Sequence, residues 1–213
     1  MKILNTVFNS YMVNTYLCVT DNNNAIMIDA AFSNDEEWAI MKSKINELHL
    51  NLKMVLLTHS HADHIIGLAM LKKDFPEVQI VAHKESLSWY QSVNDFAILM
   101  GFDKQNIPPI DRYIDDNELI KIDDEEIEVK HTPGHTEGCT CYYLPKEDVV
   151  FTGDTLFRAS VGRTDLAGGN FDLLTQSIKS KLYILPENTL VLPGHGEATD
   201  IAYEKNNNPF VKY

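Results

Sequence analysis

Three histidines and an aspartate lie within the short segment Thr58–His64, which reads Thr-His-Ser-His-Ala-Asp-His. The segment follows the apolar run Met54–Leu57, which has the composition of a short buried strand. Neutral imidazole and carboxylate are the ligands that zinc prefers among groups without sulfur, and iron or manganese also accept them. This density of ligand side chains in one turn predicts a metal site.

Three further candidate ligands, each preceded by a glycine, follow strand-like runs later in the chain. The complete candidate set is His59, His61, Asp63, His64, His135, Asp154 and His195. This set is too large for one tetrahedral ion and suits two divalent ions that share a bridging carboxylate, for which Asp154 is the natural candidate. Loops that follow strands of a rigid scaffold are where such sites are built.

The elements that must position these residues can be predicted from hydrophobic periodicity and turn residues. We expect strands over residues 1–8, 15–20, 25–28, 53–57, 78–82, 125–130, 140–144, 149–151 and 189–192. Ser33 and Glu36 have the spacing of a capping box, which predicts a helix from Ser33 to about residue 48. Further helices are expected over 65–72, within 85–116 before a loop, and over 170–182, with Asn170 as its cap.

Strands and a helix, followed by a similar set, predict an α/β (α+β) protein with two packed sheets and helices outside. The length of 213 residues fits a single domain over 1–213. The net charge of −13, from 18 basic and 31 acidic residues, argues against a nucleic-acid partner. No apolar run reaches the roughly 20 residues of a membrane span, and no signal peptide is visible, so we expect a cytoplasmic protein. Its three cysteines are expected to be buried free thiols.

The order of the motifs resembles that of a known family. After the cluster at 58–64, the chain carries Thr132-Pro133-Gly134-His135-Thr136, Thr152-Gly153-Asp154-Thr155 and Pro193-Gly194-His195. Over essentially the whole chain, this series is similar to the metallo-β-lactamase superfamily. The resemblance implies an αββα sandwich in which two mixed sheets pack face to face, with the metal ions at one edge.

The resemblance also implies a role for each ligand. Its first ion would be held by His59, His61 and His135, its second by Asp63, His64 and His195, and Asp154 would bridge both. Within the superfamily, the chain most resembles the short branch of the glyoxalase II-like hydrolases (hydroxyacylglutathione hydrolases). The long enzymes of that group add a C-terminal helical domain with basic contacts to glutathione. We expect this chain to be too short to contain one, which leaves the thiol carrier open.

Two divalent ions, with Zn²⁺ favoured and Fe or Mn as alternatives, would lower the pKa of a shared water towards neutrality. Asp63, a ligand beside that water, would orient it and accept its proton, which makes it the predicted catalytic residue. A thiolate, with a pKa near 8.5, leaves without a strong general acid, whereas an amide nitrogen must be protonated. The favoured activity is therefore hydrolysis of a small-molecule acyl thioester.

Three other interpretations stay open. Persulfide dioxygenases share a similar stretch to His131–Cys139, and in them a single iron would be held by residues equivalent to His59, His135 and Asp154. A lactonase or another ester hydrolase could use the same site. A binding protein that has lost its chemistry is disfavoured because no ligand is missing. Among neighbouring residues, Arg163 and Asp165 are expected to form an ion pair that braces the Asp154 loop, and His131 to support a ligand or its loop.

Overall fold

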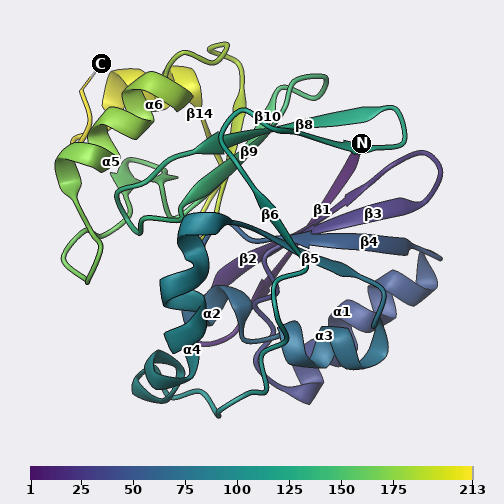
Figure 1. The fold of residues 1–213 in the computed structure, drawn as a ribbon. Helices are drawn as coiled ribbons and strands as arrows, with labels where there is room; N and C mark the ends of the chain where they lie inside the picture. Colours follow the sequence, from purple (N-terminus) through teal and green to yellow (C-terminus); the bar gives the residue numbers. More distant parts are fainter. Residues whose placement is uncertain (213) are drawn as a thin grey trace.

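The structure is a computed structural model that describes residues 1–212, and two six-stranded sheets packed face to face form its centre (Figure 1). The strands of the first sheet are β1 (Lys2–Phe8), β2 (Val13–Val19), β3 (Asn24–Ile28), β4 (Asn51–Leu56), β5 (Gln79–His83) and β6 (Arg112–Ile114). They lie side by side in chain order. The pairs β1–β2 and β2–β3 are antiparallel, and β3 to β6 run parallel, so the sheet is mixed.

The second sheet is built from the C-terminal half of the chain. Its strands are β7 (Leu119–Ile122), β8 (Glu125–His131), β9 (Thr140–Leu144), β10 (Val149–Gly153), β13 (Leu190–Pro193) and β14 (Thr199–Asp200). Their order is β14-β13-β10-β9-β8-β7, with β10 and β13 parallel and the other pairs antiparallel. The short hairpin of β11 (Leu156–Phe157) and β12 (Ser160–Val161) follows β10 in the chain.

Alternate residues of the central strands contribute to different cores. In β3, Ile26 and Ile28 pack between the two sheets, whereas Ala25 and Met27 pack against the N-terminal helices. Because both faces are covered, the strand reads as a continuous apolar run. A third core joins the second sheet to the C-terminal helices and includes Cys141, Tyr143, Val150, Val191, Leu174, Ile178, Leu182 and Ile201. The layers therefore run helix, sheet, sheet, helix, which confirms the predicted αββα sandwich.

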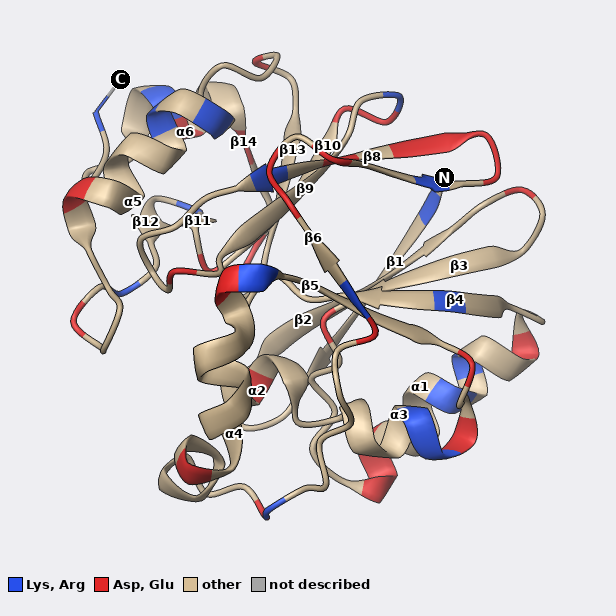
Figure 2. Cartoon of the chain, viewed as in Figure 1, with Lys and Arg blue, Asp and Glu red and all other residues tan. Residues whose placement is uncertain are grey.

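Helices cover the outer faces of both sheets (Figure 1). They are α1 (Asp35–Glu47), α2 (Ala62–Ile65), α3 (Leu68–Asp74), η1 (Lys84–Ser86), α4 (Leu87–Leu99), α5 (Phe171–Ser177), η2 (Ile178–Leu182) and α6 (Ile201–Asn207). Lys and Arg lie on α1, α3 and α6, whereas α4 carries none (Figure 2). Among the described residues, no helix combines the length and apolar character needed to cross a membrane.

The first helix begins later than the capping-box pattern predicts, so that prediction was wrong. Asn34 rather than Ser33 is the N-cap, and its side-chain oxygen accepts a hydrogen bond from Glu37 N at 3.0 Å. Glu37 rather than Glu36 reaches back, accepting bonds at 2.7 Å from the backbone nitrogens of Ser33 and Asn9. The shifted cap thereby ties α1 to the loop after β1.

The helix predicted over 65–72 is interrupted and forms α2 and α3. Gly67, between them, donates its N–H to the carbonyl of Ala30 at 2.9 Å. A Cβ atom at Gly67 would lie 2.5 Å from the ring of Phe32, so this junction packs directly on the loop after β3. The close approach at a glycine explains why the helical periodicity does not continue as one helix.

The remaining expectations agree with the structure in outline. Asn170 caps α5, as predicted, by accepting a bond from Leu173 N at 3.0 Å, and the helix continues as a π-helical turn in η2. The segment 85–116 contains α4 and then a long connection, as expected, but it ends in the strand β6. The three cysteines are buried and free. The sequence interpretation missed β6, β7, β11, β12, β14 and α6.

Candidate metal centre

The seven predicted ligand residues converge at one end of the two sheets, where β4, β8, β10 and β13 end. Four of them lie in residues 59–64, directly after β4 of the first sheet. Each of the other three follows a strand of the second sheet. The site therefore spans the boundary between the two sheets.

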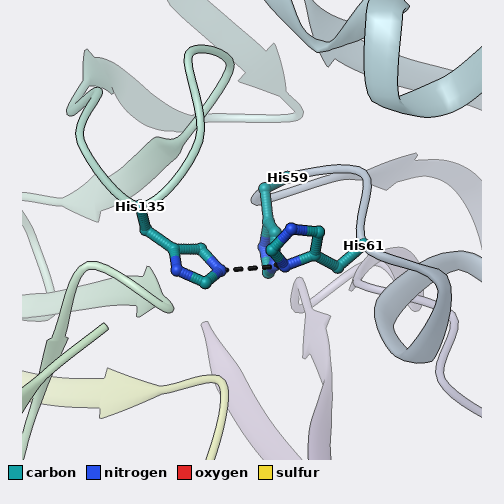
Figure 3. Close-up of side chains that lie close together, drawn as sticks. All are labelled: His59, His61 and His135. Carbon is teal, nitrogen blue, oxygen red and sulfur yellow. Dashed lines mark hydrogen bonds between the residues drawn. The ribbon is translucent and has the colours of Figure 1, made fainter. Parts of the chain in front are cut away.

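The first group consists of His59, His61 and His135. His59 Nε2 lies 3.1 Å from His61 Nδ1, which in turn lies 2.9 Å from His135 Nε2. Figure 3 shows the three rings turned towards one another. A neutral imidazole has a proton on one ring nitrogen and a lone pair on the other. The three nitrogens that face one another can therefore offer lone pairs to a shared ion.

The second group consists of Asp63, His64 and His195. The Nε2 atoms of the two histidines are 3.2 Å apart. Asp63 Oδ2 lies 3.8 Å from His64 Nε2 and 3.6 Å from His195 Nε2. In both groups, all ligand atoms lie within 4.8 Å of one another, which is the spacing expected of atoms around a common ion.

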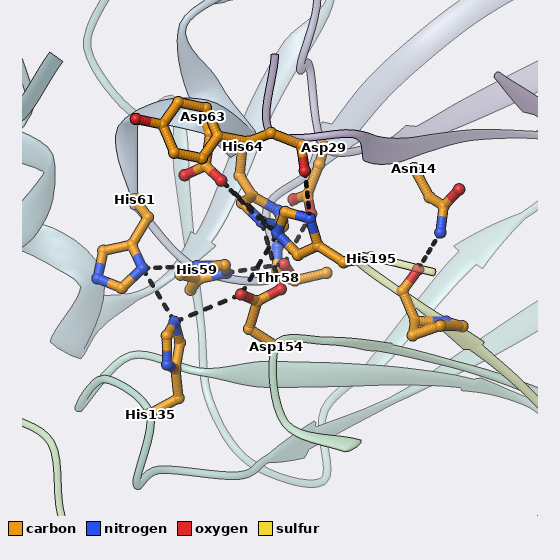
Figure 4. A network of polar contacts seen from close by, with 12 residues as sticks. Asn14, Asp29, Thr58, His59, His61, Asp63, His64, His135, Asp154 and His195 are labelled. Carbon is orange, nitrogen blue, oxygen red and sulfur yellow. Dashed lines mark hydrogen bonds and ion pairs between the residues drawn. The ribbon is translucent and has the colours of Figure 1, made fainter. Parts of the chain in front are cut away.

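Asp154 lies between the two groups (Figure 4). Its Oδ1 is 3.3 Å from His64 Nε2, and its Oδ2 is 3.5 Å from His195 Nε2 and 3.7 Å from His135 Nε2. Oδ1 is buried and makes no well-aligned hydrogen bond to any described residue. One carboxylate thus reaches both groups with an oxygen left to coordinate, so these residues fit two divalent ions.

Glycines allow the ligand loops to approach closely. Gly134 has a φ of 141°, and a Cβ there would meet Leu174 N of α5 at 2.3 Å. A Cβ at Gly194 would lie 2.6 Å from Asp154 Oδ1, inside the centre itself. Larger residues at these two positions would move His135 or His195, which explains the Gly-His pairs in the sequence.

Four of the five histidines use their other ring nitrogen to bind a protein oxygen. Such an outer hydrogen bond fixes the tautomer and leaves the second nitrogen free for a metal ion. In each of these four the outer atom is Nδ1, which leaves Nε2 as the candidate ligand atom. The pairs are His59 with Thr58 Oγ1 at 3.1 Å, His64 with Asp29 at 2.7 Å, His135 with the Arg163 carbonyl at 2.7 Å, and His195 with the Tyr11 carbonyl at 2.9 Å.

His61 is the exception. It presents Nδ1 to the first group, and its buried Nε2 has no hydrogen-bond partner among the described residues. Its ring instead packs edge-on against Trp89 of α4, with centroids 4.5 Å apart and an angle of 80° between the planes. An aromatic side chain of α4 therefore holds one ligand of the first group in place.

Burial keeps two histidines of the first group in the neutral form that a metal ion requires. It lowers the pKa of His59 well below the usual value and that of His61 to about 3, so both rings are neutral. Burial also acts on Asp154 and favours protonation, but the neighbouring His64 outweighs it and holds the pKa of Asp154 well below its usual range. The centre thus offers two neutral imidazoles, His59 and His61, beside the ionised carboxylate of Asp154.

In the second group, His64 lies among three carboxylates. Burial lowers the pKa of His64, but the carboxylates of Asp154, Asp63 and Asp29 outweigh it and raise that pKa well above the usual value. Positive charge is therefore stabilised beside His64 Nε2. A divalent cation satisfies the same carboxylates, in keeping with the chemistry of the ligand set.

Asp29 is a functional residue whose role the sequence did not reveal. It is 1 % exposed and accepts hydrogen bonds from His64 Nδ1, Thr58 N and Thr58 Oγ1 at 2.7 to 2.8 Å. Thr58 Oγ1 in turn pairs with His59. One buried carboxylate therefore positions ligands of both groups. The available signal was an acidic residue directly after an apolar strand and followed by two alanines.

The predicted ion pair between Arg163 and Asp165 and the predicted loop-supporting role of His131 are confirmed. Arg163 forms a two-pronged ion pair with Asp165, with both N–O distances 2.8 Å. His131 supports the loop that carries His135, because its Nε2 pairs with the Glu137 carbonyl at 2.7 Å and its ring stacks on His83 at 3.8 Å. Neither His131 nor His83 joins the ligand groups.

A cavity of about 440 Å³ opens beside the ligands. Its inner wall consists of ligand residues, and its outer wall is mostly apolar. The lining comprises Tyr11, His61, Ala62, Asp63, Trp89, Phe96, Leu99, Met100, His135, Asp154, Arg163, Leu166 and His195. Pockets of this volume hold small-molecule ligands.

Curated relatives match nearly the full length of the chain. One is the probable metallo-hydrolase YqgX of Bacillus subtilis, 36% identical over 200 residues that cover 93% of this chain and 92% of the relative. Another is the hydroxyacylglutathione hydrolase GloC of Haemophilus influenzae, 35% identical over 209 residues that cover 95% and 94% of the two chains.

Solved structures share the fold. The BLEG-1 B3 metallo-beta-lactamase superposes with a TM-score of 0.87 at 32% identity and covers 100% of both chains. TTHA1623 in a di-iron-bound form superposes with a TM-score of 0.84 at 30% identity, and the match covers 98% of this chain and 100% of the other. The sequence model of the metallo-beta-lactamase superfamily matches residues 9–195, which include all seven predicted ligand residues. The chain therefore belongs to the metallo-beta-lactamase superfamily of metal-dependent hydrolases.

Proposed function

We propose that the protein hydrolyses acyl thioesters with two divalent ions held by His59, His61, Asp63, His64, His135, Asp154 and His195. The observation that carries this proposal is the position of Asp154, whose two oxygens lie within 3.7 Å of nitrogens from both groups. A likeness to a hydroxyacylglutathione hydrolase at 35% identity supports the thioester class.

The ions, when bound, would supply a hydroxide from water near neutral pH and polarise the substrate carbonyl. Asp63 lies at the cavity wall and is the residue that orients the attacking water and accepts its proton. Asn9 fixes this part of the chain, because its side-chain amide donates to the carbonyls of Asp63 at 2.9 Å and Ala31 at 2.8 Å. A base held in a fixed position contributes roughly 10²–10⁴-fold to a rate.

The cavity favours a leaving group that needs no proton. Among the described residues that line it, the carboxyl groups are Asp63 and Asp154, and both belong to the proposed centre. The Tyr11 hydroxyl donates to the Met100 carbonyl at 3.0 Å and is already engaged. A thiolate leaves without an acid, whereas the nitrogen of an amide or lactam must be protonated. This supports a thioester over a β-lactam substrate.

The alternative of a single-iron dioxygenase would use His59, His135 and Asp154. That assignment leaves Asp63, His64 and His195 without a function, although they converge as closely as the first group. A lactone or other ester would also react with the same nucleophile, because its alkoxide leaves more readily than an amide anion. An alkoxide is nevertheless a poorer leaving group than a thiolate. Two ions and a thioester therefore account for more of the site.

The test begins with protein stripped by a chelator and reloaded separately with Zn²⁺, Fe²⁺ or Mn²⁺. Metal content is measured by mass spectrometry, hydrolysis is measured on S-lactoylglutathione and on simple acyl thioesters, and oxygen uptake is measured with glutathione persulfide. Two ions per chain with thioester cleavage are expected. One iron with oxygen uptake and no hydrolysis would overturn the proposal.

A variant tests the role of Asp63. Asp63→Asn is expected to lower kcat about 100-fold or more while the protein stays folded, because an amide cannot accept the proton of water. Asp95→Asn, which removes an exposed carboxylate from α4, serves as the matched control and should leave kcat unchanged. Equal rates for the two variants would exclude Asp63 as the base.

A further inference from the structure

The outer wall of the cavity is apolar because α4 supplies most of it. Trp89 and Phe96 lie on this wall, followed by Leu99 and Met100 at the end of the helix. Leu99 is 81% exposed, which is unusual for a leucine on a helix that also buries Val93 and Ala97. Exposed apolar side chains gathered at the mouth of a cavity mark a surface that a ligand covers.

Positive charge is nearly absent from the same cavity. Arg163 is the one Lys or Arg among the described residues that line it. Its guanidinium is occupied by Asp165, which binds both Nε and Nη2 at 2.8 Å. No Lys or Arg occurs along α4 (Figure 2). Among the described residues, the cavity therefore offers no unpaired Lys or Arg side chain to a substrate carboxylate.

We propose that the site selects thioesters that join an apolar acyl group to a thiol without carboxylates, and disfavours thioesters of glutathione. This inference rests on the proposed thioesterase function. Glutathione carries two carboxylates, and a carboxylate that loses water without gaining a partner is costly to bury. The net charge of −13 adds a repulsion that acts on any anionic substrate as it approaches.

The α4 wall also predicts a dependence on acyl length. Each methylene that moves from water onto an apolar surface improves binding about fourfold. The improvement should continue while the chain covers Trp89, Phe96 and Leu99, and should stop once the cavity of about 440 Å³ is filled. Lactoyl is a short and polar acyl group, so it uses little of this wall.

Binding and hydrolysis are measured separately, so that the two proposals can fail independently. Zinc-loaded protein is titrated with two non-hydrolysable thioethers, S-butyl-N-acetylcysteamine and S-butylglutathione, by calorimetry. Hydrolysis is measured on S-lactoylglutathione and on S-acyl-N-acetylcysteamines of increasing chain length. We expect the uncharged thioether to bind at least 10-fold more tightly, and kcat/KM to rise about fourfold per methylene before levelling.

Two pairs of variants assign the preference to named residues. Leu99→Ser should lower the affinity for the uncharged thioether about 10-fold, and Ile98→Ser, which changes an exposed residue of α4 outside the cavity lining, should not. Asp165→Asn frees Arg163 and should improve binding of S-butylglutathione about 3- to 10-fold. Its control is Glu126→Gln, which breaks the exposed Lys121–Glu126 ion pair, also 2.8 Å long, on β7 and β8.

Each outcome decides one of the two proposals. Tighter binding of S-butylglutathione, or equal effects of Leu99→Ser and Ile98→Ser, would overturn the inference about the substrate class. If either result were found and S-lactoylglutathione were still hydrolysed, the thioesterase proposal would remain supported. Preferred binding of the uncharged thioether without cleavage of any thioester would support the apolar selectivity and overturn the thioesterase function.

Discussion

Asp29 offers a sharp test of how the centre is organised. In Asp29→Asn the shape of the side chain is kept, but one oxygen becomes an amide that donates. Its present oxygens accept from Thr58 N at 2.8 Å and from both Thr58 Oγ1 and His64 Nδ1 at 2.7 Å. An amide cannot accept all three bonds, so either Thr58 loses a partner or His64 moves its proton to Nε2. A proton on Nε2 occupies the position through which His64 would bind an ion.

Two effects follow with different magnitudes. Loss of an outer partner of a metal-binding histidine costs about 10–100-fold in metal affinity. A buried donor left without a partner costs about 1–3 kcal/mol of folding free energy, which corresponds to a fall in Tm of about 2–12 °C for a chain of this size. The affinity is measured by competition with a zinc chelator, and Tm is measured on metal-free protein.

Tyr142→Phe is the matched control. The Tyr142 side chain is buried, and its hydroxyl donates to the carbonyl of Leu57, the residue before Thr58, at 2.7 Å rather than to a predicted ligand residue. Its loss should cost about 1 kcal/mol and leave metal affinity unchanged. If Asp29→Asn bound two ions with the affinity of the unmodified protein, the claim that Asp29 sets the tautomer of His64 would be refuted.

Three further predictions concern other parts of the molecule. Asp154→Asn should retain at most one ion per chain and lose hydrolysis, and unchanged metal content with full activity would exclude the bridging role. Glu204→Gln should lower the free energy of unfolding by about 2 kcal/mol in urea without changing metal content, because the buried carboxylate accepts bonds from Ala159 N, Thr199 and Asn208. Burial, and then the stacked His131, lowers the pKa of His83 to about 4 in the folded protein, so the unfolded chain binds more protons below the usual value of 6.5. The free energy of unfolding, measured by chemical denaturation at each pH, should therefore fall by about 1–2 kcal/mol from pH 6.5 to pH 4. The same measurement on His83→Asn should show a smaller fall over this range.

The convergence of the candidate ligand residues could be predicted because metal binding needs particular side chains and places them after strands. Their partners could not. Asp29 has the appearance of an ordinary turn residue, and only the fold brings it to His64. Trp89 lies on a helix whose apolar periodicity is equally consistent with core packing, and its contact with His61 depends on how α4 is placed.

The long central strands and the two-sheet arrangement were predictable because residues buried on both faces form continuous apolar runs. The missed strands β6, β11, β12 and β14 have at most three residues, too few for a periodic signal. The position of the α1 cap could not be predicted for a different reason. Ser33 and Asn34 are both suitable caps, and the contact between Glu37 and Asn9, distant in the sequence, favours Asn34.

The ligand set is divided between the two sheets, with residues 59–64 after β4 and the other three ligands after strands of the second sheet. Ions held as proposed would act as a crosslink between halves of the chain that also adhere through apolar side chains and through hydrogen bonds such as that from the Tyr16 hydroxyl to the Pro193 carbonyl. By mass action, an ion present at a thousand times its dissociation constant adds about 4 kcal/mol to stability. Metal starvation would then shorten the lifetime of the protein as well as abolish its turnover, because the uncrosslinked chain opens more often to proteases.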